Sequence, residues 1–178
     1  MKTNVALIGF MGTGKSAVGR ELARRLGKEF VEMDELIVER AGKPIPRIFR
    51  EDGEAAFRQM EMAVAKEVAG RSNQVIACGG GVVLNRVNID RLRQTSRLVH
   101  LVASPATILQ RTRTQAGQRP LLDVADPAGR IIRLLEERQP LYQAAADIVV
   151  ETDGQTVAGV ADTIITRLKE DEGYAFPE

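Results

Sequence analysis

The sequence predicts an α/β fold in which helices cover a parallel sheet. Five short apolar runs alternate along the chain with longer amphipathic stretches. The runs lie at residues 5–8, 30–31, 74–77, 97–102 and 147–150. Because they lack the polar alternation of a half-exposed strand, they are typical of strands buried on both faces, as in a parallel sheet. Strand–helix alternation over one domain indicates a layered α/β architecture.

Helical periodicity predicts five helices between and after these strands. They are expected at about residues 15–26, 54–70, 105–113, 127–145 and 155–170. In the second, Phe57, Met60, Val64 and Val68 recur at the spacing of one helix face. The segment 112–127 contains glycine, prolines and mixed charge, so we expect a long mobile loop. Loops of that length inside a domain are often functional.

The composition indicates one globular domain. The chain has 178 residues, of which 44% are hydrophobic and 28% charged, which is typical of a globular protein and disfavours intrinsic disorder. We expect a single domain over residues 1–170 and a frayed tail over residues 171–178. Lysine and arginine total 25 against 24 acidic residues. This balance gives no general attraction to nucleic acid or anionic lipid, and we expect neither as a partner.

Cysteine content and hydropathy indicate a cytoplasmic location. A single cysteine cannot form an internal disulfide and is too few for a structural zinc site, which favours a reducing compartment. No apolar run approaches the roughly 18 residues of a membrane span. The apolar segment near the N-terminus is also too short for a signal peptide.

The most specific motif is a phosphate-binding loop. Residues 9–16 match the pattern G-x-x-x-x-G-K-[ST] between a predicted strand and a predicted helix. Glycines let backbone N–H groups surround phosphate oxygens, and the helix N-terminus adds positive potential. Lys15 would reach the outer phosphates, and the Ser16 hydroxyl would hold Mg²⁺. The predicted nucleoside triphosphate site comprises Gly12, Thr13, Gly14, Lys15, Ser16 and Ala17.

Three further motifs are less specific when each is taken alone. Glu32 and Asp34 follow the second strand, where two carboxylates at a strand end would project alike toward a metal ion and an acceptor hydroxyl. Arg58 and Glu61 lie three residues apart on one helix face, which is also typical of a surface ion pair. Residues 79–81 are three consecutive glycines. Such a run favours close approach of a ligand to the main chain.

In order and spacing, these motifs resemble those of the shikimate kinases, a family of P-loop kinases. The resemblance covers about residues 4–168 and includes Arg119-Pro120-Leu121-Leu122 in the predicted loop and Arg138 with Pro140-Leu141-Tyr142 near a helix end. It implies a P-loop kinase fold with a five-stranded parallel sheet, flanking helices and a lid at about residues 112–127. It also implies Mg²⁺-dependent transfer of the ATP γ-phosphate to the 3-hydroxyl of shikimate in aromatic amino-acid synthesis. We expect a monomer.

The resemblance also implies roles for individual residues. Asp34 would contact the ring hydroxyls of shikimate and act as a base. Arg58 and Arg138 would hold the carboxylate, which suits a planar, two-pronged donor. Arg119 would be the lid arginine that closes over the transferring phosphoryl group. The remaining substrate residues would be the apolar wall Phe49 and Phe57, the orienting residue Glu61, and the backbone of Gly79, Gly80 and Gly81.

Two assignments stay open. Arg111 and Arg113 compete for the arginine that contacts adenine, and residues 152–155, including Gln155, would form the turn on its other side. The family usually has Asp-x-Asp where this chain has Glu32-Met33-Asp34. Glu32 keeps the negative charge but is one methylene longer, and its contact with Mg²⁺ is the second assignment left open.

Other interpretations are weaker. Cys78 and His100 are each expected to be buried structural residues rather than a nucleophile or a ligand. Another small-molecule kinase of the same fold, such as a gluconate kinase, is the main alternative, because both acceptors are hydroxylated carboxylates. A small-GTPase-like switch is disfavoured because the guanine motif N-K-x-D is absent. A binding-only relative is disfavoured because the expected charged catalytic positions are filled.

Overall fold

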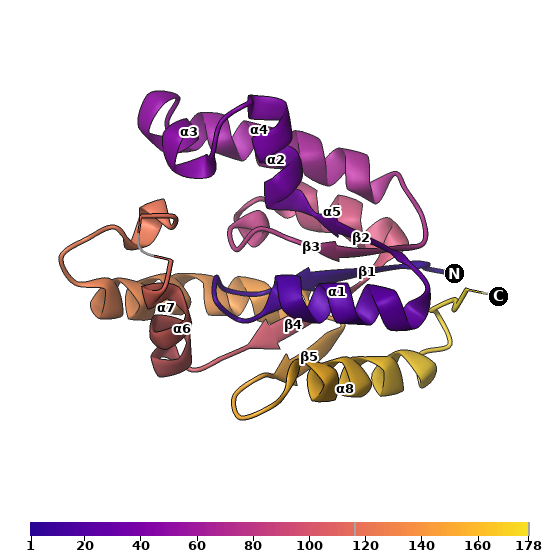
Figure 1. The fold of residues 1–178 in the computed structure, drawn as a ribbon. Coiled ribbons are helices and arrows are strands. Elements are labelled where there is room, and N and C mark those ends of the chain that lie inside the picture. Colours follow the sequence, from indigo (N-terminus) through magenta and orange to yellow (C-terminus); the bar gives the residue numbers. More distant parts are fainter. Residues whose placement is uncertain (116, 178) are drawn as a thin grey trace.

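A five-stranded parallel sheet forms the centre of the molecule (Figure 1). The computed structural model describes residues 1–115 and 117–177. The strands follow the spatial order β2-β3-β1-β4-β5, and every pairing is parallel. Their bounds are β1 Asn4–Ile8, β2 Glu29–Glu32, β3 Gln74–Ala77, β4 Ser96–Val102 and β5 Ile148–Glu151. The predicted parallel sheet is therefore confirmed.

The described residues form eight α-helices. They are α1 Lys15–Leu26, α2 Met33–Ala41, α3 Ile45–Glu51, α4 Glu54–Ala69, α5 Arg86–Thr95, α6 Pro105–Arg113, α7 Pro127–Ala145 and α8 Val157–Lys169. Two short 3-10 helices are η1 Val82–Leu84 and η2 Pro120–Leu122. The five predicted helices are confirmed, whereas α2, α3 and α5 were not predicted. For α5 a local signal exists, because the Asn85 side chain accepts a hydrogen bond from the backbone N–H of Val87 as an N-cap.

The two faces of the sheet contribute to separate hydrophobic clusters. In β1, Val5 and Leu7 point to one face and Ala6 and Ile8 to the other, as strand geometry requires. The first face packs against α1 and α8, and the second packs against residues from α2 to α7. Because both faces are covered, all five β1 residues are buried. This explains why the sequence shows an unbroken apolar run there.

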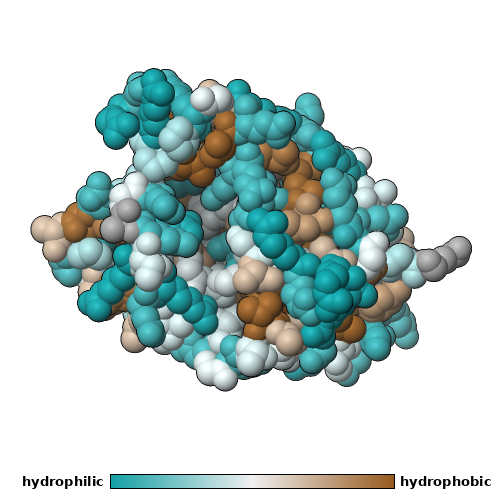
Figure 2. Space-filling model, viewed as in Figure 1, coloured by the Kyte–Doolittle hydropathy of each residue, from teal (hydrophilic) through white to brown (hydrophobic). Residues whose placement is uncertain are grey.

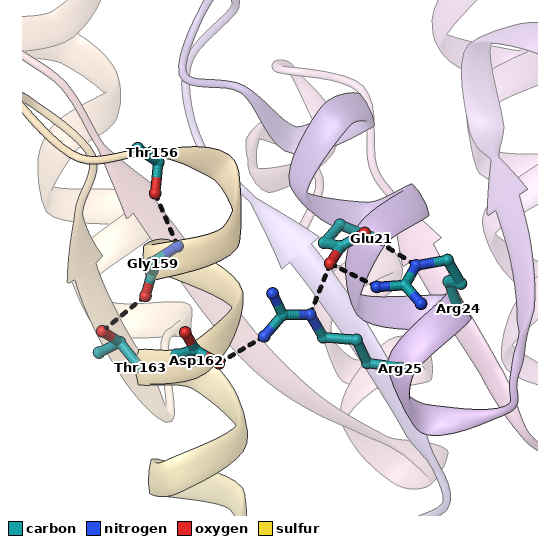
Figure 3. Close-up of polar contacts among 7 residues, drawn as sticks. All are labelled: Glu21, Arg24, Arg25, Thr156, Gly159, Asp162 and Thr163. Atoms are coloured by element: carbon teal, nitrogen blue, oxygen red, sulfur yellow. Dashed lines mark hydrogen bonds and ion pairs between the residues drawn. The ribbon is translucent and has the colours of Figure 1, made fainter.

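Helices α1 and α8 lie side by side on their face of the sheet (Figure 3). Arg25 of α1 pairs with Glu21 on its own helix and with Asp162 on α8. The Thr156 side chain caps α8 by accepting a hydrogen bond from the Gly159 N–H. Exposed ion pairs contribute at most about 1 kcal/mol each, so the buried apolar contacts dominate this packing.

The C-terminal segment packs against the start of the chain, as far as the structure describes it. Tyr174 is buried, and the Lys2 N–H donates to Gly173 O at 2.9 Å. Arg97 in β4 forms an ion pair with Asp171. The sequence predicts fraying over residues 171–178, but the Tyr174 ring joins the α1–α8 cluster and ties the segment down. Glu178 lies outside the described residues.

The chain segments that follow β1, β2 and β3 all begin at the carboxyl edge of the sheet. This edge is opposite the two termini, which lie together on the right of Figure 1. The expected lid corresponds to the connection between α6 and α7, residues 114–126, of which Ala116 lies outside the described residues. Among the described residues, none of the helices combines the length and apolarity needed to cross a bilayer.

Candidate active site

The phosphate-binding loop connects β1 to α1 and is held by its own polar groups. The Lys15 ammonium donates hydrogen bonds to the carbonyl oxygens of Gly9, at 2.8 Å, and Phe10, at 2.9 Å. The Thr13 hydroxyl also donates to Phe10 O, at 2.8 Å. Gly9 has φ +148°, and a Cβ there would lie 2.5 Å from a carbonyl oxygen of β4. Only glycine fits at this position, so the loop is shaped before any ligand binds.

Burial changes the acidity of the lysine in this loop. It lowers the pKa of Lys15 to about 8, and the nearby Arg119 guanidinium adds to this effect. The Asp34 carboxylate acts in the opposite direction. The buried, charged Lys15 ammonium has few compensating negative charges around it, so it attracts the anionic oxygens of a ligand strongly.

Ser16 and Glu32 meet at the end of β2. The Ser16 hydroxyl donates to Glu32 Oε1 at 2.5 Å, and Arg20 Nη2 lies 3.6 Å from Glu32 Oε2. Glu32 is the last residue of β2, whereas Asp34 lies in the first turn of α2. The prediction that Glu32 and Asp34 project alike from a strand end is therefore wrong in its geometry. Both nevertheless line the same cavity, because the helix begins directly after the strand.

The Ser16–Glu32 pair fits a magnesium ion. A hydroxyl and a carboxylate oxygen are hard donors of the kind that Mg²⁺ accepts. The described residues contain no group of three or more His, Cys, Asp or Glu side chains that could enclose a metal ion. Mg²⁺ in phosphoryl-transfer sites takes one or two protein ligands and completes its shell with waters and phosphates, which agrees with this sparse donor set.

One cavity surrounds the phosphate-binding loop. The predicted nucleotide residues that line it are Gly12, Gly14, Lys15, Ser16, Ala17, Arg111 and Arg119. Thr13 is buried, and its hydroxyl bond to Phe10 O lies inside the loop. Arg111 Nη1 donates to Gly12 O at 3.1 Å and lies 3.5 Å from Thr152 Oγ1, so it joins the loop to the turn after β5. Arg113 instead lines a separate cavity between α6 and α7.

Gln155 lies apart from this cavity. Its side-chain amide donates to Glu151 O at 2.6 Å, and its side chain is exposed. The adjacent Asp153 carboxylate accepts a hydrogen bond from the Ser104 N–H. The turn after β5 is therefore ordered by contacts with the start of α6.

A second cavity holds every residue predicted to bind the acceptor. These nine residues are Asp34, Phe49, Phe57, Arg58, Glu61, Gly79, Gly80, Gly81 and Arg138. Phe49 and Phe57 form a wall, with ring centroids 4.8 Å apart. Sequence reasoning missed Ile45 and Gln118, which also line the cavity. Ile45 begins α3, a helix that the sequence did not reveal.

Several buried polar atoms in this cavity have no partner among the described residues. They are Asp34 Oδ1, Glu61 Oε2, Arg58 Nε and Arg138 Nε. Burial raises the pKa of both Asp34 and Glu61, although neighbouring cations oppose the shift. A buried polar group without a partner costs about 1–3 kcal/mol. Two carboxylate oxygens and two guanidinium nitrogens around one cavity suit a ligand that carries both hydroxyl donors and an anionic group.

The three-glycine run provides space for the polar side chains around it. A Cβ on Gly79 would lie 2.7 Å from Glu61 Oε2 and 3.0 Å from Asp34 Oδ1. A Cβ on Gly81 would overlap the Arg58 guanidinium, whose Nη1 donates to Glu61 Oε1 at 3.0 Å. The run is therefore needed for the protein's own charged groups to pack as well as for access of a ligand to the backbone.

The two cavities meet at a small set of residues. Met11, Asp34, Gly80 and Arg119 line both of them. Arg119 comes from the connection between α6 and α7, where its Nε donates to Gln115 Oε1 at 3.0 Å. Figure 2 shows this side of the molecule as a hollow with a largely hydrophilic rim. The arrangement can hold a polyphosphate on one side and a hydroxylated carboxylate on the other, with Asp34 and Arg119 between them.

Cys78 and His100 are both buried, as the sequence predicts. Burial raises the pKa of the Cys78 thiol to about 12 and lowers that of His100 to about 4. The thiol is therefore protonated and the imidazole neutral near pH 7. Neither has the ionisation state of a nucleophile or of a charged phosphate ligand.

Comparison with known proteins identifies the family. The family model described as shikimate kinase matches residues 11–169. A shikimate kinase from Symbiobacterium thermophilum is 43% identical over 168 residues, covering 94% of this chain and 97% of that protein. The structure of a shikimate kinase from Acinetobacter baumannii in complex with shikimate superposes with a TM-score of 0.93 at 36% identity, over 97% of this chain and 96% of that one. A gluconokinase from Sinorhizobium meliloti, at 21% identity, a TM-score of 0.57 and 94% coverage of each chain, shares the fold. The chain belongs to the shikimate kinase family.

Proposed function

We propose that this chain transfers the γ-phosphate of ATP to the 3-hydroxyl of shikimate, which yields 3-phosphoshikimate and ADP. The step belongs to chorismate and aromatic amino-acid biosynthesis. The observation that carries the proposal is the junction of the two cavities at Asp34 and Arg119. A phosphate donor and a carboxylate acceptor bound on either side would have their reacting groups adjacent there, which is the main requirement of phosphoryl transfer.

On the nucleotide side, Lys15 and the glycine-rich backbone bind the phosphates. Charged Lys15 exchanges its bonds to Gly9 O and Phe10 O for phosphate oxygens, and the N-terminus of α1 adds partial positive charge. Arg111 is the arginine that contacts the adenine, because it lies between the phosphate loop and the turn after β5. This favours Arg111 over Arg113.

Ser16 and Glu32 hold Mg²⁺ beside the phosphates. When bound, the ion neutralises charge on the β- and γ-phosphate oxygens. Glu32 keeps the charge of the usual aspartate, and its longer side chain already reaches the Ser16 hydroxyl. The substitution is therefore compatible with metal binding.

On the acceptor side, Arg58 and Arg138 hold the carboxylate of shikimate, and Asp34 hydrogen-bonds the ring hydroxyls. Glu61 orients Arg58 through their 3.0 Å hydrogen bond. Asp34 is buried and lies near Lys15, Arg58 and Arg119, so its carboxylate can accept the proton of the attacking hydroxyl as the bond to phosphorus forms. The Phe49–Phe57 wall packs against the apolar side of the ring.

Arg119 completes the site from the lid. Its guanidinium contacts the transferring phosphoryl group and stabilises the charge that shifts toward the leaving ADP. Closure of the lid also excludes water, which would otherwise compete with the hydroxyl as acceptor. The protein acts in this way as a monomer in the cytoplasm.

A gluconate kinase is the alternative within this fold, and acceptor preference distinguishes the two. The experiment is an ADP-release assay with ATP and Mg²⁺ and a panel of hydroxy acids that includes shikimate and gluconate, with Lys15→Met as the inactive control. In the presence of ATP and Mg²⁺, shikimate should be the only acceptor of the panel that supports rapid ADP formation. Faster turnover of gluconate would contradict the assignment, and ADP release without any acceptor would indicate a simple ATPase.

A further inference from the structure

A buried tyrosine connects helix α7 to the three-glycine run. Tyr142 lies one helical turn after Arg138, and its side chain is fully buried. Its hydroxyl donates a hydrogen bond to the carbonyl oxygen of Gly80, the middle glycine. Its ring stacks on His100 of β4, with centroids 5.0 Å apart and planes inclined by 27°. Because the ring is confined by the core, the hydroxyl is held at the Gly80 carbonyl.

The ionisation states of Tyr142 and His100 suit a permanent hydrogen bond from the Tyr142 hydroxyl to Gly80. Burial raises the pKa of Tyr142 to about 12, so its hydroxyl keeps its proton throughout the neutral range. His100 is neutral because burial lowers its pKa. The Tyr142 hydroxyl is thus a constant donor to Gly80.

The orientation of the Gly80 carbonyl decides the orientation of the next amide. The peptide between Gly80 and Gly81 is planar and trans, so its carbonyl and its N–H point in opposite directions. Gly81 lines the acceptor cavity, and the Arg58 guanidinium packs against it. In the described part of the chain, no backbone carbonyl or side-chain oxygen accepts a hydrogen bond from the Gly81 N–H. The amide is thus an available donor close to Arg58.

Glycine runs need such a restraint more than other sequences do. Three consecutive glycines have many accessible backbone conformations, and each must be limited to one for the site to be preorganised. Downstream, the run is tied to η1 by hydrogen bonds from Val82 N to Gly79 O, at 3.1 Å, and from Leu84 N to Gly81 O, at 3.0 Å. Helix α7 packs against η1, so Tyr142 and Arg138 reach the run from the same rigid element.

We propose that Tyr142 is a positioning residue for the acceptor site. Its hydroxyl orients the Gly80–Gly81 peptide so that the Gly81 N–H is presented, beside Arg58 and Arg138, to the carboxylate of the acceptor. The identity of that acceptor rests on the proposed function, whereas the ordering of the loop does not depend on it. Tyr142 acts through Gly80, its hydroxyl also lies beside the Arg138 side chain, and it takes no part in phosphoryl transfer.

The test compares Tyr142→Phe with the matched control Tyr174→Phe. Both variants remove one hydroxyl from a buried tyrosine, but Tyr174 packs in the cluster of α1 and α8, and its hydroxyl has no partner among the described residues. In the ligand-free protein, amide hydrogen exchange by NMR should be about fivefold faster at Val82 and Leu84 in Tyr142→Phe, as expected for one lost hydrogen bond. Exchange at these amides should be unchanged in Tyr174→Phe.

Kinetics supply a readout that general destabilisation would not reproduce. Tyr142→Phe should raise the KM for shikimate about fivefold and leave the KM for ATP and kcat within about twofold, because only acceptor binding loses a preorganised donor. Tyr174→Phe should match the parent protein. An unchanged KM for shikimate, or an equal rise in both KM values, would overturn the proposal.

Failure of this inference and failure of the proposed function are distinguishable. A parent protein that does not phosphorylate shikimate contradicts the proposed function and leaves the exchange measurement valid. Unchanged exchange at Val82 and Leu84 in Tyr142→Phe contradicts the positioning role, whatever the acceptor is.

Discussion

The Ser16 hydroxyl donates a hydrogen bond to Glu32 Oε1 at 2.5 Å, from the first turn of α1 to the last residue of β2. The helix that follows β1 and the last residue of β2 therefore place a hydroxyl and a carboxylate oxygen together in the nucleotide cavity. Their contact shows that the glutamate is long enough to reach the residue expected to ligate the metal.

Glu32→Gln should raise the Mg²⁺ concentration for half-maximal turnover roughly 10- to 100-fold, because the amide fills the same space without the charge that attracts the ion. The measurement is a Mg²⁺ titration of initial rate, supported by calorimetry of ATP binding with and without Mg²⁺. Glu35→Gln is the matched control, since Glu35 pairs with the same Arg20 but is 67% exposed. Identical Mg²⁺ dependence in Glu32→Gln and the parent would remove Glu32 from the metal site.

Arg58→Ala and Arg138→Ala should each weaken shikimate binding by about tenfold to over a hundredfold. This corresponds to the loss of one charge-assisted hydrogen bond, roughly 1.5–3 kcal/mol. The KM for ATP should change little, because neither arginine lines the nucleotide cavity in the described part of the chain. Calorimetry with shikimate measures the effect directly.

Two further variants make this test of the carboxylate-binding arginines specific. Arg138→Lys keeps the charge and should recover only part of the affinity, because an ammonium cannot form the two-pronged contact. Arg86→Ala is the control, since Arg86 is 92% exposed on α5. Parent-like affinity in both Arg58→Ala and Arg138→Ala would show that another group binds the carboxylate.

Arg119→Ala should bind shikimate almost normally but turn over at least about a hundredfold more slowly. The proposed contact strengthens as charge shifts during transfer, so its loss lowers kcat and kcat/KM together. Arg119→Lys should recover part of the rate. Arg113→Ala is the control, because Arg113 lies on α6 close in sequence to Arg119 but is not among the described residues that line the nucleotide cavity or the acceptor cavity. An unchanged kcat in Arg119→Ala would remove the lid arginine from the chemistry.

ATP affinity should fall as the pH rises through 8. Burial lowers the pKa of Lys15 to about 8 in the free protein, and bound phosphates favour the charged form and raise it again. Above pH 8 binding must therefore take up a proton, which should weaken ATP binding roughly tenfold between pH 7 and pH 9. Calorimetry in two buffers of different ionisation enthalpy measures both the affinity and the proton uptake.

Lys15→Met provides the control for the pH experiment. It should bind ATP weakly at every pH and lose the affinity change between pH 7 and pH 9. The same slope in this variant would assign the titration to another group.

Local signals made most of the fold predictable. The apolar runs identified the strands, and the helical spacing of Phe57, Met60, Val64 and Val68 identified α4. Helices α2 and α3 escaped prediction because they are short and amphipathic over few turns. They are stabilised instead by a few buried side chains, notably Met33, Ile37 and Ile48, that join the core of the whole domain. Tertiary packing of that kind has no local signature.

The sequence by itself determined the phosphate-binding loop, because all its elements lie within eight consecutive residues and need only a strand before and a helix after. Only the tertiary structure decided which distant residues meet. It brought Asp34, Arg58, Gly80 and Arg138 around one cavity, placed Arg111 rather than Arg113 beside the phosphate loop, and set Tyr142 against Gly80. These contacts join segments separated by tens of residues. They depend on the order of the strands and the packing of helices on both faces of the sheet, which no local spacing specifies.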